Sequence, residues 1–193
     1  MGSEMCIRDS SKGEKVDDNM LDLTVIIGGA ASGKSAYAEA LALSGEGSPI
    51  YIATAQAYDT EMQSKIRLHK ERRGPKWHTI EEPIALTEQL SALEPTGSVL
   101  VDCVTMWLSN IMIMDEDTDQ ACDRLCQNLP LFNGRLIIVT NEVGHGVVPP
   151  TKLGRAFQNK QGRLNQNLAS LAARVIFVTA GLPLALKGTL PLD

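Results

Sequence analysis

The chain has 193 residues, 44% of them hydrophobic and 21% charged, and this size and balance predict one domain with a sizeable core. A net charge of -5 argues against a nucleic-acid or anionic-membrane binder, which usually carries a basic stripe. No apolar run approaches the roughly 18 residues that a membrane span needs. The cysteines show no CxxC or zinc spacing and no secretory signal precedes them, which predicts a cytoplasmic protein with reduced thiols.

The N-terminal residues 1–20 differ in composition from the rest of the chain. They hold few apolar residues, show no periodicity and carry mixed charges. Such a segment cannot bury enough apolar surface to offset the entropy lost on ordering. We therefore expect residues 1–20 to be a disordered or non-native leader and residues 21–193 to form the domain.

From residue 21 onward, apolar strand-like runs alternate with helix-like segments. This alternation, with β-branched residues in the strands, predicts an α/β fold with a parallel sheet covered on both faces. The predicted strands are residues 23–27, 50–53, 77–80, 99–101, 136–140 and 175–179. The predicted helices are residues 34–43, 59–73, 84–93, 105–114, 121–129 and 154–174.

The segment after the first strand fits the phosphate-binding pattern G-x-x-x-x-G-K-[ST] and opens a predicted helix, which is the context that this motif requires. Glycines allow backbone N–H groups to converge on phosphate oxygens, and the helix N-terminus adds a positive dipole end. The lysine reaches the outer phosphates and the last hydroxyl ligates Mg²⁺. The motif predicts a nucleoside triphosphate but no particular reaction; its residues are Gly28, Gly29, Ala30, Ala31, Ser32, Gly33, Lys34 and Ser35.

A carboxylate near the motif is needed to hold the metal. Residues 99–101 form an apolar strand that ends at Asp102, as in a Walker B strand. The alternative role for Asp102 is the N-cap of the next helix. Glu142, just beyond the strand at 136–140, is the other candidate, because parallel sheets place ligands at the carboxyl ends of their strands.

His69 lies on a basic predicted helix. At helical spacing Lys65, Arg72 and Arg73 share its face. Neighbouring cations disfavour the imidazolium form, which leaves a neutral, nucleophilic ring suited to attack an α-phosphorus and form a phosphoramidate. The residues alone favour the plainer alternative, an ordinary charged helix on the surface.

Several segments together resemble the adenosylcobinamide kinase/adenosylcobinamide-phosphate guanylyltransferase family, and the resemblance extends from residue 23 to residue 188. In order they are GGAASGKS (28–35), YIATAQAYDTEM (51–62), KIRLHKERR (65–73), WHTIEEP (77–83), LVDCVTMWLSN (100–110), VTNEVGHGVVP (139–149), GRLNQNLA (162–169) and AGLPLALKG (180–188).

The resemblance implies a P-loop NTPase fold, RecA-like, often trimeric, with a mostly parallel sheet and helices on both faces. It implies phosphorylation of adenosylcobinamide with ATP or GTP, then transfer of GMP from GTP to adenosylcobinamide phosphate through a guanylylated histidine, releasing pyrophosphate. The implied partners are these corrinoid substrates and further copies of the chain, with no nucleic acid and no membrane span.

By the same resemblance His69 is the histidine that carries GMP, while the P-loop motif and the strand end make Ser35 and Asp102 the candidate ligands of Mg²⁺. The implied nucleotide contacts are residues 28–35, Thr54, Ala55, Gln56, Lys70, Glu71, Arg72, Arg73, Glu81 and Asp102. Asp102 has two open roles, a metal ligand or, like Glu81, an acceptor of a guanine or ribose hydrogen bond.

The chain departs from the family at two positions. Ala31 stands where many relatives carry Arg, which removes one anchoring charge near the phosphates, and Asp102 stands where some relatives have Glu. Two other functions remain: a P-loop small-molecule kinase in which His69 is structural, and a nucleotide-binding module that transfers no group.

Overall fold

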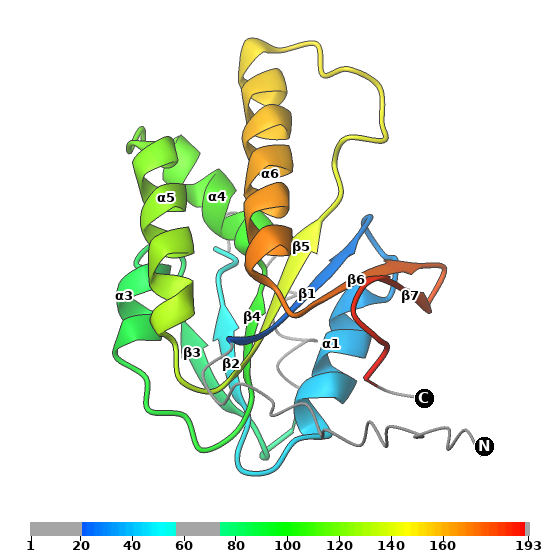
Figure 1. Cartoon of the computed structure of the whole chain (residues 1–193). Helices are drawn as coiled ribbons and strands as arrows, with labels where there is room; N and C mark the ends of the chain where they lie inside the picture. Colours follow the sequence, from blue (N-terminus) through cyan, green and yellow to red (C-terminus); the bar gives the residue numbers. More distant parts are fainter. Residues whose placement is uncertain (1–20, 57–73, 192–193) are drawn as a thin grey trace, which may run out of the picture.

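The computed structural model describes residues 21–56 and 74–191. Within them the chain forms a seven-stranded sheet in the order β3-β2-β4-β5-β1-β6-β7 (Figure 1). All strand pairs are parallel except β6 with β7. The strands are β1 Asp22–Gly28, β2 Ile50–Ala53, β3 His78–Glu81, β4 Val99–Asp102, β5 Arg135–Asn141, β6 Arg174–Thr179 and β7 Leu182–Lys187.

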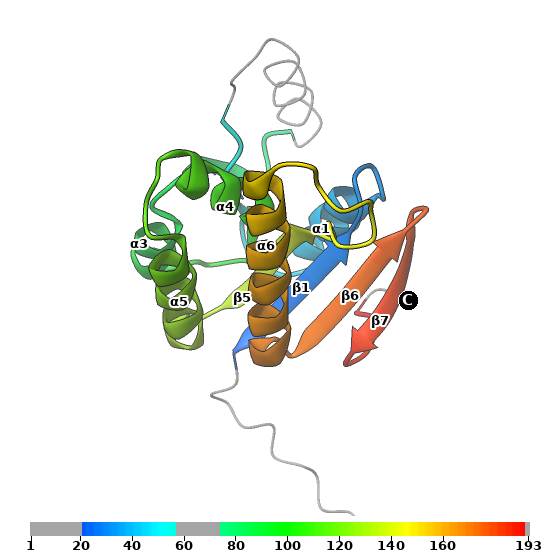
Figure 2. The ribbon, with the colours of Figure 1, turned by 90° about the horizontal axis from the view of Figure 1, so that it is seen from above.

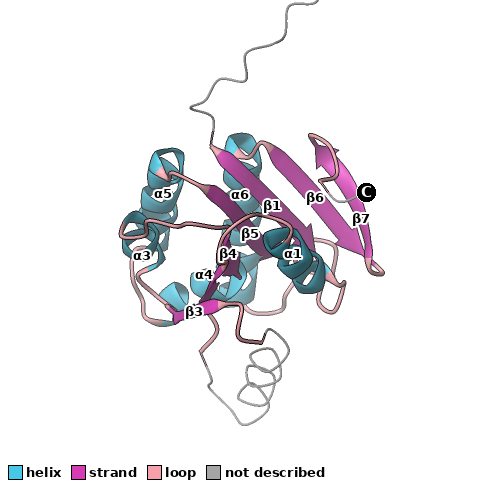
Figure 3. Cartoon of the chain, turned by 90° about the horizontal axis from the view of Figure 1, so that it is seen from below, coloured by secondary structure: helices cyan, strands magenta, loops and turns pink. Residues whose placement is uncertain are grey.

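Helices cover both faces of this sheet, as the alternating sequence predicts (Figures 2 and 3). α1 packs on one face, against β1, β4, β5 and β6, while α4 and α6 pack on the other face and α5 packs against both of them. The described helices are α1 Lys34–Leu43, α3 Leu86–Ser91, α4 Val104–Ile113, α5 Thr118–Asn128, α6 Lys152–Leu171 and the short 3-10 turn Leu129–Leu131.

Alternate residues of the central strands supply two separate cores. In β1, Val25 and Ile27 belong to the cluster under α4 and α6, whereas Ile26 belongs to the cluster under α1. Complete burial of such a side chain contributes about 2 kcal/mol. Aliphatic packing on both faces therefore holds β1 in the middle of the sheet, and the loop that follows β1 begins from a rigid support.

Most predicted elements are confirmed. The predicted bounds of α1 and β2 agree with the structure, and the other described elements shift by a few residues. The long predicted helix at 154–174 ends earlier, at Leu171, because Arg174 already begins β6. The helix predicted at 59–73 and the leader at 1–20 lie outside the described residues. Among the helices described, none is long and apolar enough to cross a membrane.

Strand β7, which is not among the predicted elements, pairs antiparallel with β6 at the edge of the sheet. A two-residue turn joins the strands, and both Ala180 and Gly181 have positive φ, 52° and 79°. Hairpins favour such turns because the twist matches that of the strands. Pro183 obscured the strand, although an edge strand tolerates proline.

Candidate nucleotide site

The glycine-rich segment is a loop between β1 and α1, at the carboxyl edge of the sheet. Gly33 has a φ of 94° and Ala31 a φ of 55°, so the loop turns through the left-handed region twice. A side chain at Gly28 would collide with the backbone oxygen of Val178 in β6. The tight turn thus depends on glycine at Gly28 and Gly33, as the motif predicts.

Lys34 and Ser35 begin α1 and so stand at the positive end of its dipole. The Lys34 ammonium donates a hydrogen bond to the carbonyl of Gly29, 3.0 Å away. This contact folds the lysine back over its own loop. Lysine and helix N-terminus therefore converge on one small volume, which suits phosphate oxygens.

The hairpin between β6 and β7 supports the loop from the side. The Gly181 amide donates to the carbonyl of Ser32 at 2.9 Å. A Cβ at Gly33 would lie 3.1 Å from the Cα of Gly181, which shows how closely the two backbones approach. This support is not among the features predicted from the sequence, although the turn-forming pair Ala180-Gly181 was a signal for it.

Asp102 ends β4 and is half-buried, with an aromatic partner from β2. The hydroxyl of Tyr51 donates to Asp102 Oδ2 at 3.0 Å. The Tyr51 ring meets Trp77 edge-on, with ring centroids 5.9 Å apart. Because the tyrosine is held on both sides, it fixes the carboxylate of Asp102 at the edge of the sheet. The N-cap of α4 is the next residue, Cys103, and it caps with no side-chain hydrogen bond.

Burial, and after it the charge of Asp102, raises the pKa of the adjacent Cys103 thiol to about 11. The thiol is therefore neutral near physiological pH and is no nucleophile in this site.

Thr54 follows β2 and is completely buried. Its hydroxyl donates to the carbonyl of Cys103 at 2.7 Å and accepts from the Cys103 amide at 2.9 Å. The Asn110 amide in turn donates to the Thr54 carbonyl at 2.8 Å. Thr54 thus joins the ends of β2 and β4, while the half-buried Ala55 and Gln56 continue along the carboxyl edge.

Glu81 ends β3, and three strands separate β3 from β1, the strand that precedes the P-loop. The register places it level with Ala53, which is itself level with Asp102. With strands about 4.8 Å apart, β3 lies roughly 19 Å from β1. Glu81 and Asp102 therefore share one edge, but Glu81 is remote from the phosphate loop.

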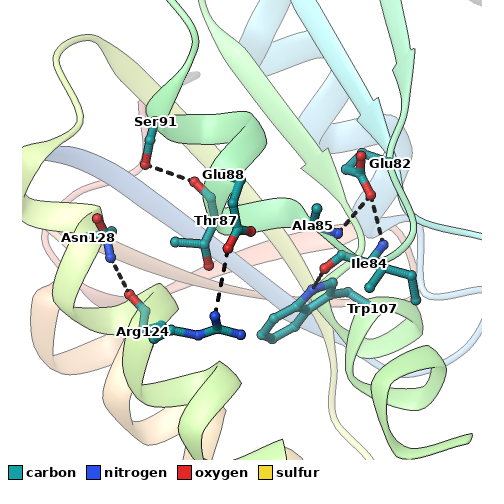
Figure 4. A network of polar contacts seen from close by, with 9 residues as sticks. All are labelled: Glu82, Ile84, Ala85, Thr87, Glu88, Ser91, Trp107, Arg124 and Asn128. Carbon is teal, nitrogen blue, oxygen red and sulfur yellow. Dashed lines mark hydrogen bonds and ion pairs between the residues drawn. The ribbon is translucent and has the colours of Figure 1, made fainter. Parts of the chain in front are cut away.

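Figure 4 shows the carboxylate of Glu82 directed at the backbone of Ile84 and Ala85, in the segment before α3. Its Oε1 accepts from the amides of Ile84 and Ala85, at 3.0 and 2.7 Å. The Trp107 indole donates to the Ile84 carbonyl at 2.8 Å. Glu82 thus has a structural role, since it holds the backbone of the segment before α3.

The tip of β5 lies beside the P-loop, level with Gly28. The register pairs Gly28 with Asn141, and the amide of Glu142 donates to the Gly28 carbonyl at 3.1 Å. Buried polar side chains of α4 and α6 gather beneath this tip, which the sequence analysis missed. The available signal was the pair Gln161 and Asn165, polar residues four apart on a helical face with Leu164 and Leu168.

The remaining predicted residues are His69, Lys70, Glu71, Arg72 and Arg73, which lie outside the described residues. Their predicted roles stay predictions. The described edge already combines one ammonium, a helix N-terminus, a hydroxyl and several carboxylates. That set can bind a triphosphate and orient its outer phosphate.

A cavity of about 340 Å³ between α3 and α5 contains none of the predicted site residues. Its lining includes Leu125, Leu129 and Phe132, which precede the amino end of β5. It therefore lies apart from the carboxyl edge that carries the P-loop.

Comparison with known proteins finds a matching family and relatives that cover most of the chain. A model of the family described as cobinamide kinase / cobinamide phosphate guanyltransferase matches residues 24–186. A bifunctional adenosylcobalamin biosynthesis protein of Pseudomonas aeruginosa is 45% identical over 167 residues, 85% of this chain and 96% of the relative. A protein of the same description from Escherichia coli is 35% identical over 184 residues, 86% of this chain and 99% of the relative.

Among solved structures, an ATPase of the type III secretion system of pathogenic bacteria aligns with a TM-score of 0.50 and 14% identity. The alignment covers 84% of this chain and 54% of that chain. At this identity the likeness shows the shared P-loop NTPase fold alone. The sequence matches extend over nearly the whole described domain, from the P-loop strand to the last hairpin. The chain therefore belongs to the cobinamide kinase / cobinamide phosphate guanyltransferase family.

Proposed function

We propose that this chain phosphorylates the alcohol of adenosylcobinamide with ATP or GTP and then transfers GMP from GTP to adenosylcobinamide phosphate. Kinase and guanyltransferase are the activities of the family to which it belongs. The observation that carries the proposal is the P-loop, whose lysine, helix N-terminus and neighbouring carboxylate edge form the binding site for a triphosphate.

In the kinase reaction the chain's main contribution is to position and neutralise charge. Backbone amides of residues 28–35 hold the phosphates, and Lys34 turns from the Gly29 carbonyl toward the outer phosphate oxygens. The alcohol oxygen bonds to the γ-phosphorus as the bond from that phosphorus to the β–γ bridging oxygen breaks. A nucleoside diphosphate leaves.

Ser35 and Asp102 offer the oxygen ligands that Mg²⁺ prefers, a hydroxyl and a carboxylate. Asp102 keeps a fixed orientation because Tyr51 donates to its Oδ2. Within the described residues no cluster of three or more acidic, histidine or cysteine ligands occurs, and Mg²⁺ in such sites needs only one or two protein ligands, with phosphates and water as the rest. When bound, the ion would neutralise phosphate charge.

In the guanylyl transfer, His69 is the proposed nucleophile. Its imidazole nitrogen bonds to the α-phosphorus of GTP while the bond to the α–β bridging oxygen breaks and pyrophosphate leaves. An oxygen of adenosylcobinamide phosphate then displaces the histidine from that phosphorus. The basic segment 65–73 supports this role, because its cations favour both a neutral ring and a bound triphosphate. The other proposed nucleotide contacts are Thr54, Ala55, Gln56, Lys70, Glu71, Arg72, Arg73 and Glu81.

The histidine step is tested with GTP labelled on its α-phosphate with radioactive phosphorus. Protein isolated in alkali retains a phosphoramidate, whereas acid releases it. Label is expected on the wild type and on His78→Ala, an exposed control, and absent from His69→Ala. An unlabelled wild type that still phosphorylates cobinamide overturns the transferase half and leaves the plain kinase. Hydrolysis of nucleotide with no corrinoid turnover favours the nucleotide-binding module.

We also propose that the chain acts as a homotrimer in the cytoplasm, where nucleoside triphosphates are abundant. Exposed leucines on the edge strand β7 support the assembly. Leu182 and Leu184 are 70% and 58% exposed, and the register places them on one face with Thr179 and Phe177. A row of exposed leucines is typical of a surface that another copy covers.

A further inference from the structure

The segment that leaves β5 brings an additional carboxylate to the P-loop. β5 lies between β1 and β4, and Asn141 at its end is level with Gly28. The amide of the next residue, Glu142, donates to the Gly28 carbonyl at 3.1 Å. Since neighbouring strands are about 4.8 Å apart, Glu142 begins within one strand spacing of the loop that binds the phosphates.

The backbone just before Glu142 is fixed by side chains of two helices. The Asn141 amide donates to the Thr105 hydroxyl of α4 at 2.7 Å. Its carbonyl accepts from the Asn165 amide of α6 at 3.1 Å. At the end of a strand these backbone groups would ordinarily meet water. Here they are held by side chains that are themselves buried.

The same helix also holds the residue after Glu142. Gln158 donates to the Val143 carbonyl at 2.9 Å. Beneath the tip, the Thr140 hydroxyl and the Gln161 amide both donate to Asn165 Oδ1, at 2.7 and 2.9 Å. A connected network of buried hydrogen bonds of this kind fixes one geometry. The position of Glu142 is therefore set by the P-loop, α4 and α6 together.

The side chain of Glu142 is half-buried and accepts a short hydrogen bond from the Gly144 amide. Beyond Gly144 the loop is open to solvent, with Val147 94% exposed. Figure 1 shows this segment extending away from the sheet before it returns to the start of α6. The carboxylate thus stands where a rigid strand end meets an open side, from which an acceptor can approach the outer phosphate.

The other described carboxylates at this edge are engaged or distant. Tyr51 donates to Asp102, and Asp102 fits the metal. Glu82 caps the segment before α3, and Glu81 ends a strand roughly 19 Å from β1 at about 4.8 Å per strand.

We propose that Glu142 accepts the proton of the acceptor alcohol in the kinase reaction, an inference that rests on the proposed kinase function. As the alcohol oxygen bonds to the γ-phosphorus, its proton passes to the Glu142 carboxylate. The bond to the β–γ bridging oxygen breaks, and the nucleoside diphosphate leaves. The protonated carboxyl then releases its proton to solvent.

The second reaction of the same chain has no such requirement. The acceptor of GMP is a phosphate monoester, which is already ionised and has no alcohol proton to lose. A base for the alcohol therefore affects one reaction and spares the other, whereas a residue that holds nucleotide or metal affects both.

The test compares Glu142→Gln, Glu142→Asp and Glu94→Gln with the wild type, the last being an exposed glutamate at the amino edge. Three quantities are measured separately: kcat and KM for phosphorylation of cobinamide, the rate of GMP transfer to cobinamide phosphate, and the Kd for GTP. Glu142→Gln is expected to lower the kinase kcat by about 100-fold or more, with KM, Kd and GMP transfer within about threefold. Glu142→Asp should recover part of the kcat, and Glu94→Gln should match the wild type.

A kinase kcat of Glu142→Gln within threefold of the wild type overturns the proposal. A parallel loss of both activities and of GTP affinity also overturns it and makes Glu142 a ligand for nucleotide or metal. A wild type that transfers GMP to cobinamide phosphate but phosphorylates no cobinamide removes the kinase function itself, which is a separate result.

Discussion

The amide of Gly181 donates a hydrogen bond to the carbonyl of Ser32, so the last hairpin of the chain holds the P-loop. These residues are far apart in sequence and meet because β6 lies next to β1 in the sheet. The loop is therefore braced on two sides, by Gly181 through Ser32 and by Glu142 through Gly28.

Replacement of Gly181 by alanine is expected to destabilise the fold and weaken nucleotide binding. Gly181 has a φ of 79°, where a side chain costs about 1–2 kcal/mol. Urea unfolding and a GTP titration measure the two effects. Gly162→Ala is the matched control, because a Cβ there meets no atom within 4 Å and alanine in a helix is favoured by about 0.5–1 kcal/mol. Equal unfolding free energies for the two variants would contradict the expectation.

Thr54→Val should be strongly destabilising although it barely changes the side-chain volume. The hydroxyl serves both the amide and the carbonyl of Cys103 in a fully buried place. The Cys103 carbonyl would keep the Trp107 amide as its donor, at 3.2 Å, but the Cys103 amide would lose its acceptor. One buried, unsatisfied backbone group costs about 1–3 kcal/mol. Thr54→Ser keeps the hydroxyl and should lose much less, as measured by the unfolding free energy in urea. Equal losses in the two variants would show that packing of the methyl group, and not the hydroxyl, holds the strands.

Alkaline pH is expected to destabilise the protein through Cys103. Burial and the charge of Asp102 raise the pKa of this thiol from 9.0 to about 11 in the folded state. The unfolded chain therefore loses the proton first, and the unfolding free energy falls between pH 9.0 and about 11. At about pH 10 this thiol contributes a loss of roughly 1 kcal/mol. Cys103→Ala should show a shallower decline across that interval, and an unchanged slope would exclude the thiol as its cause.

Leu184→Glu is expected to prevent association if β7 forms the interface of the proposed trimer. A carboxylate in the exposed row with Leu182 would have to be desolvated on contact. Light scattering at micromolar concentration should give the mass of one chain for the variant and of three for the wild type. Leu131→Glu changes another exposed leucine, next to α5, and this variant should assemble like the wild type. A wild type that remains monomeric removes the inference.

Local sequence patterns predicted those parts of the fold that consecutive residues determine by themselves. The strand at β1, the glycine turn and the start of α1 are consecutive, and their order alone indicates a P-loop. Asp102 was placed at a strand end for the same reason. The sheet order, by contrast, depends on which strands pair. Nothing in the sequence around Glu81 indicates that three strands separate it from β1.

Apart from strand β7, which follows β6 through a short turn, the missed features depend on contacts between distant segments. Thr54 is predicted as a nucleotide contact, but its hydroxyl meets Cys103 because β2 and β4 are neighbours. The support for Glu142 depends on where α6 crosses the tip of β5. Such contacts follow from the packing of the whole sheet, so residue spacing along the chain does not reveal them.

The edge-on contact between Tyr51 and Trp77 gives the molecule an optical probe of its own site. Trp77 touches a ring whose hydroxyl bonds Asp102, so a ligand that moves this carboxylate should alter the emission of Trp77. Trp107, the other tryptophan, is buried in the core beneath α3 and should respond only when the chain unfolds. Intrinsic fluorescence can thus follow occupancy and unfolding as two separate signals without any attached dye.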